Sequence, residues 1–334
     1  MSWKNSLAAL SDTLNRPVRD DRPRVVAIGG PTATGKTALS VALAKRFGGE
    51  IISADSMQIY KGLDVGTAKA TPEEMQGVPH HLLDILPPEE PFSVAEFTAR
   101  AGALIADITA RGGLPFVVGG TGLYITSLLG GVRFAPQPND PALRAALQAR
   151  AAAGEGRALY DELAAVDLDY AGTLHPNDEN RVIRALELYR LTGRTMTQQR
   201  AASRPETPPY RALCLCLSCP DRAVLYRRID SRVDNMAAAG ILEEARLVYG
   251  HRDSYRTAAQ AIGYKEFFPY FEGAATLAEC TAKLKQASRN YAKRQLTWFR
   301  RQTDAVWLDF TDHGLEAQAA RLVEAFLAGA PHSG

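Results

Sequence analysis

The chain has 334 residues, of which 46% are hydrophobic and 23% are charged, and its formal net charge is +2. This is the composition of an ordinary globular enzyme, so any nucleic-acid footprint has to be a local cluster of charge. Four cysteines in a chain of this length argue against a disulfide scaffold, and no run of about 18 apolar residues indicates a membrane span, so we expect a soluble, cytoplasmic protein.

Taken in chain order, residues 1–23 lack a long apolar core and are expected to form a partly disordered leader, neither signal peptide nor membrane anchor. A helix is expected from about Thr37 to Phe47, because Gly48 and Gly49 are suitable stops. Apolar segments predict five strands, at residues 24–30, 50–55, 114–120, 211–219 and 305–310. Apolar strands that alternate with helices predict an α/β fold with a parallel sheet covered by helices.

Between about Pro136 and Pro209 the sequence becomes helical and strand-free, with proline-rich segments at both ends. We interpret residues 137–209 as an all-helical insertion domain, lodged between two strands of the core. The α/β core then comprises residues 24–136 and 210–312, and its last part is mostly helical. Residues 313–334 are expected to form a C-terminal helix and tail.

A glycine-rich turn follows the first strand, in the stretch "GGPTATGKTALS". Its fixed positions match G-x-x-x-x-G-K-[ST], and a strand before it and a helix after it give the pattern its meaning as a P-loop. Backbone amides and the start of the helix would face phosphate oxygens, while Lys36 adds a cation and the Thr37 hydroxyl can hold Mg²⁺. The predicted phosphate-binding residues are Gly30, Pro31, Thr32, Ala33, Thr34, Gly35, Lys36 and Thr37.

The loop alone does not identify the phosphate compound that it binds. An enzyme that hydrolyses a nucleoside triphosphate usually has an acidic residue at the end of a second strand, but the strand "PFVV" runs into "GGTGLY" instead. Asp55, in "IISADSMQIY", is the nearest acid at a strand end. A lone aspartate there is more often a cap, but its expected place beside the P-loop favours a catalytic role.

Two clusters could suggest a bound metal. Cys214 and Cys216 alternate with leucines as one face of a buried strand, which favours a packing role over a zinc site. His80 and His81 are adjacent on an extended segment, so their side chains point apart and a shared ion is improbable.

Seven motifs occur in this order: "GPTATGKT", "SADSMQIYKGLDVGTAK", "GVPHHLLDI", "VGGTGLY", "HPNDENRVIRALE", "AIGYKEF" and "AKRQLTWFRR". Together they resemble the tRNA dimethylallyltransferase family of the bacterial type, also called tRNA isopentenyltransferases. The similarity runs from about Arg24 to Asp309, nearly the whole chain.

This resemblance implies that the loop holds dimethylallyl diphosphate, and that the acceptor is N6 of the adenosine just 3′ of a tRNA anticodon. The products would be N6-isopentenyladenosine and diphosphate. Asp55 matches the general base, while Lys36, the loop amides and Mg²⁺ on Thr37 would stabilise the leaving diphosphate. Arg232 could also reach the diphosphate, although an exposed helical arginine is an equally good interpretation.

Contact with the tRNA is implied for residues from several segments. The segment from Lys283 to Arg301 carries seven basic residues and no acid, so Lys285, Arg289 and Lys293, four residues apart, form a stripe suited to phosphates. Leu284, Tyr291 and Trp298 suit burial. The predicted tRNA contacts are Asp55, Ser56, Met57, Gln58, Thr121, Arg144, Asn180, Arg181, Val182, Ile183, Arg184, Gly263, Tyr264, Lys265, Lys285, Arg289 and Lys293.

Three other functions remain open from the residues. One is a transferase on the same fold whose acceptor is a free nucleotide such as AMP, although the helical insertion and the basic stripe argue against it. Another is an ATP-dependent small-molecule kinase, which the P-loop alone would favour. The third is a non-catalytic RNA-binding protein, for which Asp55 is the discriminating residue. We expect a monomer without membrane contact.

Overall fold

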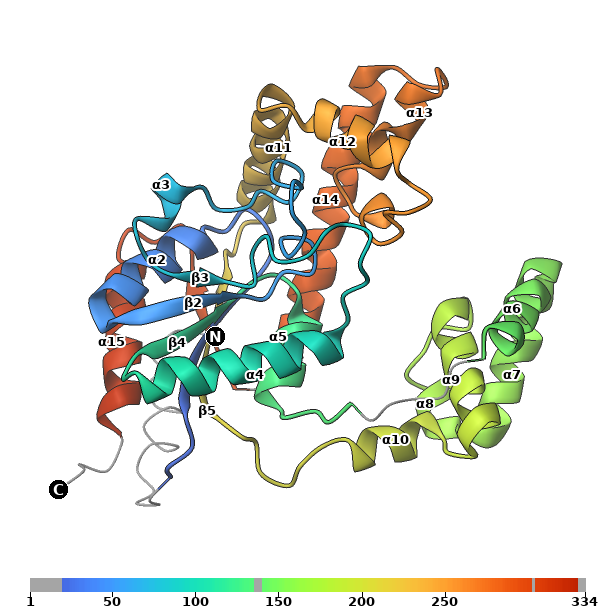
Figure 1. Cartoon of the computed structure of the whole chain (residues 1–334), viewed down its shortest axis with the longest axis horizontal. Coiled ribbons are helices and arrows are strands. Elements are labelled where there is room, and N and C mark those ends of the chain that lie inside the picture. Colours follow the sequence, from blue (N-terminus) through green and yellow to red (C-terminus); the bar gives the residue numbers. More distant parts are fainter. Residues whose placement is uncertain (1–19, 135–139, 302–303, 330–334) are drawn as a thin grey trace. The chain divides into compact units, whose positions relative to one another are not determined.

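The computed structural model describes residues 20–134, 140–301 and 304–329 (Figure 1). These residues separate into two compact units. One unit combines the chain up to Leu129 with the chain from Pro209 onward, and the other is Gly130–Pro208. The second unit therefore begins a few residues before the expected start at 137. Of the expected leader, all but residues 20–23 lies outside the described residues.

The first unit is built on a six-stranded parallel sheet with the order β3-β2-β4-β1-β5-β6. The predicted α/β fold is confirmed, and each of the five predicted strands is present. The sixth strand, β3, has only two residues and was not predicted. The strands are β1 (Arg24–Gly29), β2 (Gly49–Ser53), β3 (His80–His81), β4 (Leu114–Val118), β5 (Arg211–Ser218) and β6 (Ala305–Asp309).

Helices surround this sheet, and local sequence determines where several of them begin and end. Thr276 and Glu279 form a capping box at the start of α14, and the left-handed Gly48 ends α2. The helices of this unit are α2 (Lys36–Phe47), α3 (Pro72–Met75), α4 (Val94–Ala110), α5 (Gly122–Leu129), α11 (Arg222–Ala238), α12 (Ile241–Gly250), η2 (Ala258–Gln260), η3 (Lys265–Phe267), α13 (Phe268–Phe271), α14 (Leu277–Arg300) and α15 (Leu315–Ala328).

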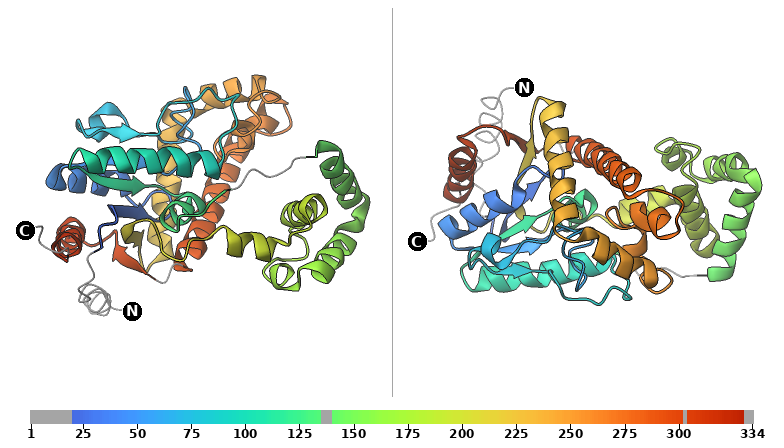
Figure 2. Two further views of the ribbon diagram at one scale, coloured as in Figure 1. Left: turned by 60° about the horizontal axis from the view of Figure 1, so that its bottom comes forward. Right: turned by 90° about the horizontal axis from the view of Figure 1, so that it is seen from above.

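The two faces of the sheet carry separate cores, because alternate residues of each strand point to opposite sides. On one face, Val25 and Val117 pack with Phe97 of α4, and on the other, Val26 and Phe116 pack with side chains of α2 and α15. Figure 2 shows α4 on one side of the sheet and α2 with α15 on the other. No helix in the described ranges has the length and apolar character needed to cross a membrane.

In its described part, residues 130–134 and 140–208, the second unit has helices joined by turns and no strand. Its own small core includes Leu147, Leu159, Leu163, Val182 and Leu186. The helices are α6 (Pro141–Arg150), η1 (Ala151–Glu155), α7 (Gly156–Val166), α8 (Leu168–Ala171), α9 (Glu179–Thr192) and α10 (Met196–Ala202).

Candidate active site

The loop between β1 and α2 has the backbone of a phosphate-binding turn. Gly30 has φ +134°, and a Cβ there would lie 2.7 Å from the carbonyl oxygen of Leu217 on β5, so only glycine fits. Ala33 and Gly35 are also left-handed, with φ of 64° and 83°, which turns the chain into the first turn of α2. The amides of this loop and of the helix start therefore form a site suited to an anion.

Lys36, the first residue of α2, turns back over this loop. Its Nζ donates a hydrogen bond to the carbonyl oxygen of Pro31 at 2.6 Å. Burial of the ammonium, and then the charge of Arg232, lower the pKa of Lys36 from its ordinary 10.5 to about 7, against the opposing charge of Asp55. A bound anion would relieve this unfavourable environment.

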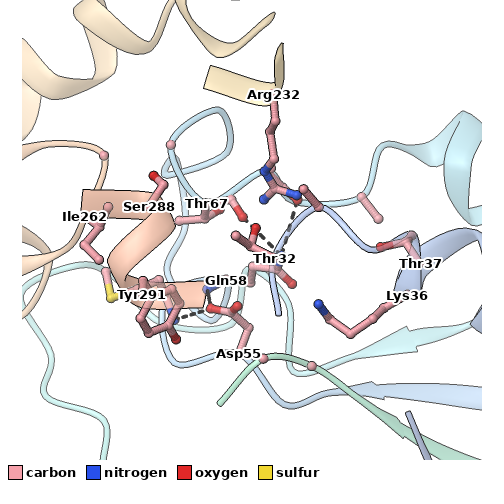
Figure 3. A pocket seen from close by; sticks show the side chains of 18 of the residues that line it. Thr32, Lys36, Thr37, Asp55, Gln58, Thr67, Arg232, Ile262, Ser288 and Tyr291 are labelled. Carbon is pink, nitrogen blue, oxygen red and sulfur yellow. Dashed lines mark hydrogen bonds between the residues drawn. The ribbon is translucent and has the colours of Figure 1, made fainter. Parts of the chain in front are cut away.

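Arg232 of α11 is a lining residue of the same cavity. Burial lowers its pKa, and the charges of Asp55 and Glu74 oppose this shift. Figure 3 shows Arg232 entering from the side of the pocket opposite Asp55. Of the two interpretations from the sequence, the structure favours the one in which Arg232 reaches a phosphate group in the cavity over that of an exposed helical arginine.

Arg228, one turn earlier on α11, also lines the cavity and was not predicted. Its guanidinium stacks over Phe310, 4.9 Å from the ring centroid, and an atom of that guanidinium would lie 3.9 Å from a Cβ at Gly35. The i, i+4 spacing of Arg228 and Arg232 places both on one helical face, and this was the signal available in the sequence.

Asp55 follows β2 and lines the cavity as predicted. Its Oδ1 accepts hydrogen bonds from the backbone amides of Met57, at 2.9 Å, and Gln58, at 3.4 Å. The carboxylate therefore caps a turn through one oxygen, as one interpretation expected, and it also lies in the cavity, as the other interpretation requires. Its second oxygen is the one left for a substrate proton.

Gln58 is held beside Asp55 by contacts on both ends of its amide. Its Oε1 accepts from Ser53 Oγ at 3.1 Å, and its Nε2 donates to the carbonyl oxygens of Thr67 and Ala68 at 3.2 and 3.3 Å. Ser56 and Met57 also line the cavity. Thr121 is not a lining residue: its Oγ1 accepts a hydrogen bond from the Ser56 amide at 3.2 Å and so supports the Asp55 turn.

Five residues of α14 line the cavity, and none was predicted as a site residue: Leu284, Ser288, Tyr291, Arg294 and Gln295. Tyr291 was expected to be buried, but it is half-buried and faces the cavity close to Asp55 (Figure 3). Burial, with the charge of Asp55, raises the pKa of Tyr291 to about 12. Gln295 accepts from the Thr32 amide and donates to the carbonyl oxygen of Gly120, both at 3.0 Å, so it joins α14 to the P-loop.

These groups enclose one cavity of about 860 Å³. An anion cradle with three cationic side chains, those of Lys36, Arg228 and Arg232, lies at one end, and a carboxylate with hydrogen-bonding side chains lies at the other. Within the described ranges, no three His, Cys, Asp or Glu side chains gather into a metal site. The arrangement can hold a di-anionic group and accept a proton from a second substrate.

Comparison with known proteins gives the family. Residues 58–302 match the family model described as IPP transferase, and residues 23–87 match the one described as isopentenyl transferase. Over 92% of this chain and 96% of the relative, the chain is 52% identical to the tRNA dimethylallyltransferase of Geobacillus thermodenitrificans. The chain belongs to the tRNA dimethylallyltransferase family. The family predicted from the seven motifs is confirmed.

Other relatives and solved structures of the family agree. The tRNA dimethylallyltransferase of Bacillus subtilis is 48% identical over 86% of this chain and 91% of its own length. The tRNA isopentenylpyrophosphate transferase from Bacillus halodurans has a TM-score of 0.67 at 44% identity, covering 92% of this chain and 96% of that one. A eukaryotic dimethylallyltransferase acting on tRNA has a TM-score of 0.77 at 30% identity, covering 93% and 81%.

The helical unit carries several of the predicted tRNA contacts of the family. Arg144, Asn180 and Arg181 are exposed, and Arg184 is half-buried. Val182 and Ile183, however, are only 1% and 4% exposed, and they pack in the core of this unit. A buried side chain cannot present itself to RNA, so the predicted contact range is corrected for these two residues.

Charges are balanced around the arginines of this unit. The guanidinium of Arg184 lies 2.9 Å from Oε2 of the fully buried Glu187, and that of Arg144 lies 3.7 Å from the same oxygen. Arg181 pairs with Asp178 at 3.3 Å. These pairs orient the guanidinium groups while leaving them at the surface.

The sequence suggested a basic stripe on α14 without acidic residues, but the structure places two carboxylates beside it. Lys285 pairs with Asp234 at 2.6 Å, and Arg289 pairs with Asp230 at 2.7 Å, both from α11. Lys293 lies 5.9 Å from the ring centroid of Tyr226. The prediction of an unneutralised stripe is wrong, because the compensating carboxylates lie on another helix more than 50 residues away in the chain.

The "GYK" segment divides between the cavity and the core. Gly263 and the exposed Lys265 line the cavity. Tyr264 is fully buried, and its hydroxyl donates to Glu244 at 2.7 Å. Its predicted contact with tRNA is therefore replaced by a packing role.

The packing interpretation of the cysteines agrees with the structure, and the side chains of the two histidines point to different partners. Cys214, Cys216 and Cys219 are free thiols, and Cys216 is buried in β5. His80 bonds through Nδ1 to the carbonyl oxygen of Val78 at 2.8 Å, whereas His81 bonds through Nε2 to Glu50 at 2.7 Å. The two rings serve different neighbours.

Proposed function

We propose that this chain transfers the dimethylallyl group of dimethylallyl diphosphate to N6 of the adenosine 3′-adjacent to the anticodon of tRNA. One observation carries the proposal. The anion cradle of the P-loop and the carboxylate of Asp55 line the same cavity, which a donor and an acceptor base can enter together. The family assignment supplies the class of reaction, a prenyl transfer to tRNA.

The donor diphosphate would lie on the P-loop. The loop amides, Lys36 and Arg232 lie there, and burial together with the charge of Arg232 lowers the pKa of Lys36 to about 7. A bound diphosphate would favour the charged form of this lysine. As the bond between C1 of the dimethylallyl group and the diphosphate oxygen breaks, the electron pair leaves with the diphosphate. The growing negative charge is what these fixed donors stabilise best.

The acceptor nitrogen requires a proton acceptor, because the lone pair of an adenine amino group is delocalised into the ring. In the proposed reaction, N6 forms a bond to C1 while its proton passes to Asp55. General base catalysis of this kind contributes about 10²- to 10⁴-fold. Gln58, held rigidly beside Asp55, offers hydrogen bonds that would orient the base.

The donor set of the loop fits Mg²⁺. Thr37 is exposed in the first turn of α2 and lines the cavity, so its hydroxyl can hold the ion together with diphosphate oxygens and water. A bound Mg²⁺ would supply additional positive charge for the leaving diphosphate.

The tRNA would present its anticodon stem-loop with the target base turned out of the stack, as enzymes that act on a base require. Ser56, Met57 and Gln58 would contact this base, and Arg144, Arg181 and Arg184 would contact the phosphates. We also propose that the reaction takes place in the cytoplasm, since its acceptor is tRNA. We propose that the enzyme works as a monomer, since the P-loop and Asp55 of the same chain line one cavity.

The test is an incubation of the full chain with Mg²⁺, dimethylallyl diphosphate and unmodified tRNA, followed by mass analysis of the nucleosides. We expect prenylated adenosine from the wild type and none from Lys36→Met. The free-nucleotide transferase predicts product on AMP but none on tRNA, and the kinase predicts consumption of ATP without either product. Either of these results would overturn the proposal.

A further inference from the structure

Glu244 of α12 binds a loop of the chain that is almost 180 residues away in sequence. Its Oε2 accepts hydrogen bonds from the amides of Asp64 and Val65 at 2.8 and 2.9 Å. Its Oε1 accepts from the Gly66 amide at 2.8 Å and from the Tyr264 hydroxyl at 2.7 Å. A carboxylate offers about four acceptor positions, so Glu244 is fully used by this one loop and its neighbour.

The same loop supports the acceptor side of the cavity. Three residues of the loop line the cavity: Gly66, whose amide Glu244 binds, and then Thr67 and Ala68. The carbonyl oxygens of Thr67 and Ala68 hold the Nε2 of Gln58 at 3.2 and 3.3 Å. Figure 3 shows Thr67, Gln58 and Asp55 around the same part of the pocket. The backbone of residues 64–68 therefore connects Glu244 to the side chain next to Asp55, with hydrogen bonds to Glu244 at one end and to Gln58 at the other.

Neighbouring side chains and backbone pack closely against this loop. A Cβ at Gly66 would lie 2.5 Å from Cε1 of Tyr264, and a Cβ at Gly263 would lie 3.2 Å from the carbonyl oxygen of Gly66. The Lys69 ammonium, 5% exposed, fixes the far end of the loop by bonding to the Tyr60 carbonyl oxygen at 2.9 Å and to Asp64 at 2.5 Å. The loop is thus held at one end by Glu244 and at the other by Lys69.

We propose that Glu244 is a positioning residue for the acceptor base. It touches no substrate, and it acts by fixing the 64–68 loop so that Gln58 is held in place beside Asp55. This inference rests on the proposed function for the identity of the acceptor. It predicts that loss of the hydrogen bonds between Glu244 and the loop impairs the reaction with tRNA, while the P-loop end of the cavity keeps its affinity for diphosphate.

The experiment compares Glu244→Gln with Glu243→Gln in the full chain. Glu243 is exposed on the same helix, so its substitution removes the same charge without touching the loop. A glutamine at 244 keeps one carbonyl oxygen and turns an amide N–H₂ toward backbone donors. We expect Glu244→Gln to lower kcat/KM for tRNA by about 10- to 100-fold, as misplacement near a reacting centre does. The Kd for pyrophosphate should stay within about twofold in both variants.

Two further readouts separate positioning from simple stability. In the free protein, amide hydrogen exchange of residues 64–66 should become faster in Glu244→Gln than in Glu243→Gln. The losses from Glu244→Gln and Gln58→Ala should be less than additive in the double variant, because both act through one side chain. Should Glu244→Gln fail to fold, Glu244→Asp, which keeps the charge on a shorter side chain, takes its place.

The outcomes are distinct. Unchanged exchange at residues 64–66, unchanged kcat/KM, or fully additive losses would each overturn the positioning role. If the wild type forms no product on tRNA, the proposed function fails instead, and the exchange measurement on the free protein still decides whether Glu244 holds the loop.

Discussion

Lys36 and Asp55 line one cavity with opposite formal charges, and backbone contacts hold both side chains in place. Lys36 donates to the carbonyl oxygen of Pro31 at 2.6 Å, and Asp55 accepts from the Met57 amide at 2.9 Å. Each contact leaves capacity for a substrate: further donor positions on the ammonium and one oxygen on the carboxylate. Substitution of either residue therefore tests whether its remaining donor or acceptor atoms take part in the reaction.

Asp55→Asn should lower kcat by about 10²- to 10⁴-fold, since the amide cannot accept the proton of N6. The asparagine oxygen can still accept from the Met57 amide, so the turn should persist and tRNA affinity should stay nearly constant. Single-turnover prenylation and a tRNA binding titration measure the two effects. A kcat within threefold of the wild type would remove Asp55 from the mechanism.

Lys36 also makes stability depend on pH. Its pKa is about 7 in the folded protein and has its ordinary value of 10.5 in the unfolded chain. Between these values the unfolded chain binds more protons, so the free energy of unfolding should rise with pH in this window. Urea denaturation at pH 7 and pH 9 should show a larger increase for the wild type than for Lys36→Met. An equal increase in both proteins would contradict the lowered pKa.

Between elements, the contact of α14 with α11 decides how much of the basic stripe faces solvent. Asp230 and Asp234 of α11 compete for Arg289 and Lys285 with any RNA phosphate. Ion pairs at the surface contribute about 0 to 1 kcal/mol each, so they neutralise charge without adding much stability. The stripe is therefore weaker as a phosphate site than its sequence suggests.

The double variant Asp230→Asn and Asp234→Asn tests this competition. Freed of their partners, Lys285 and Arg289 should raise tRNA affinity by about threefold or more at low salt and steepen its salt dependence. The free energy of unfolding should change by about 2 kcal/mol at most. Filter binding over a range of salt concentrations gives the affinity. An unchanged salt slope would place the stripe outside the RNA footprint.

At the scale of the whole molecule, the chain forms two units with separate cores, and they carry different parts of the proposed binding surface. The sheet unit contains the whole cavity, whereas the helical unit carries Arg144, Arg181 and Arg184. A change that weakens only the core of the helical unit should therefore affect the two substrates differently.

Leu186→Ala is such a change, because Leu186 is 1% exposed in the core of the helical unit. Removing this side chain costs about 2 to 5 kcal/mol, which should loosen the unit and weaken tRNA binding. Leu168→Ala, at a residue 74% exposed in the same unit, is the matched control and should bind as the wild type. Pyrophosphate affinity, measured by calorimetry, should be unchanged in both. A parallel loss of pyrophosphate affinity would show that the two units are coupled.

The sequence by itself determined the elements whose information is local. Five apolar strands, the glycine turn with Lys36 and Thr37, and Asp55 at a strand end were all predicted, since each depends on a few consecutive residues. Alternation along β5 also placed Cys216 on the face opposite Leu215. Seven ordered motifs were specific enough to give the family, and with it the class of reaction.

Tertiary structure alone decided which distant residues meet. The clamp of Glu244 on Gly66, the bridge from Gln295 to Thr32 and the pair of Arg289 with Asp230 all join parts of the chain far apart in sequence. Burial likewise showed that Tyr264 belongs to the core and Tyr291 to the cavity wall. The physical reason is that the packing of α11, α12 and α14 against the loops brings these groups together, and no local pattern encodes that packing.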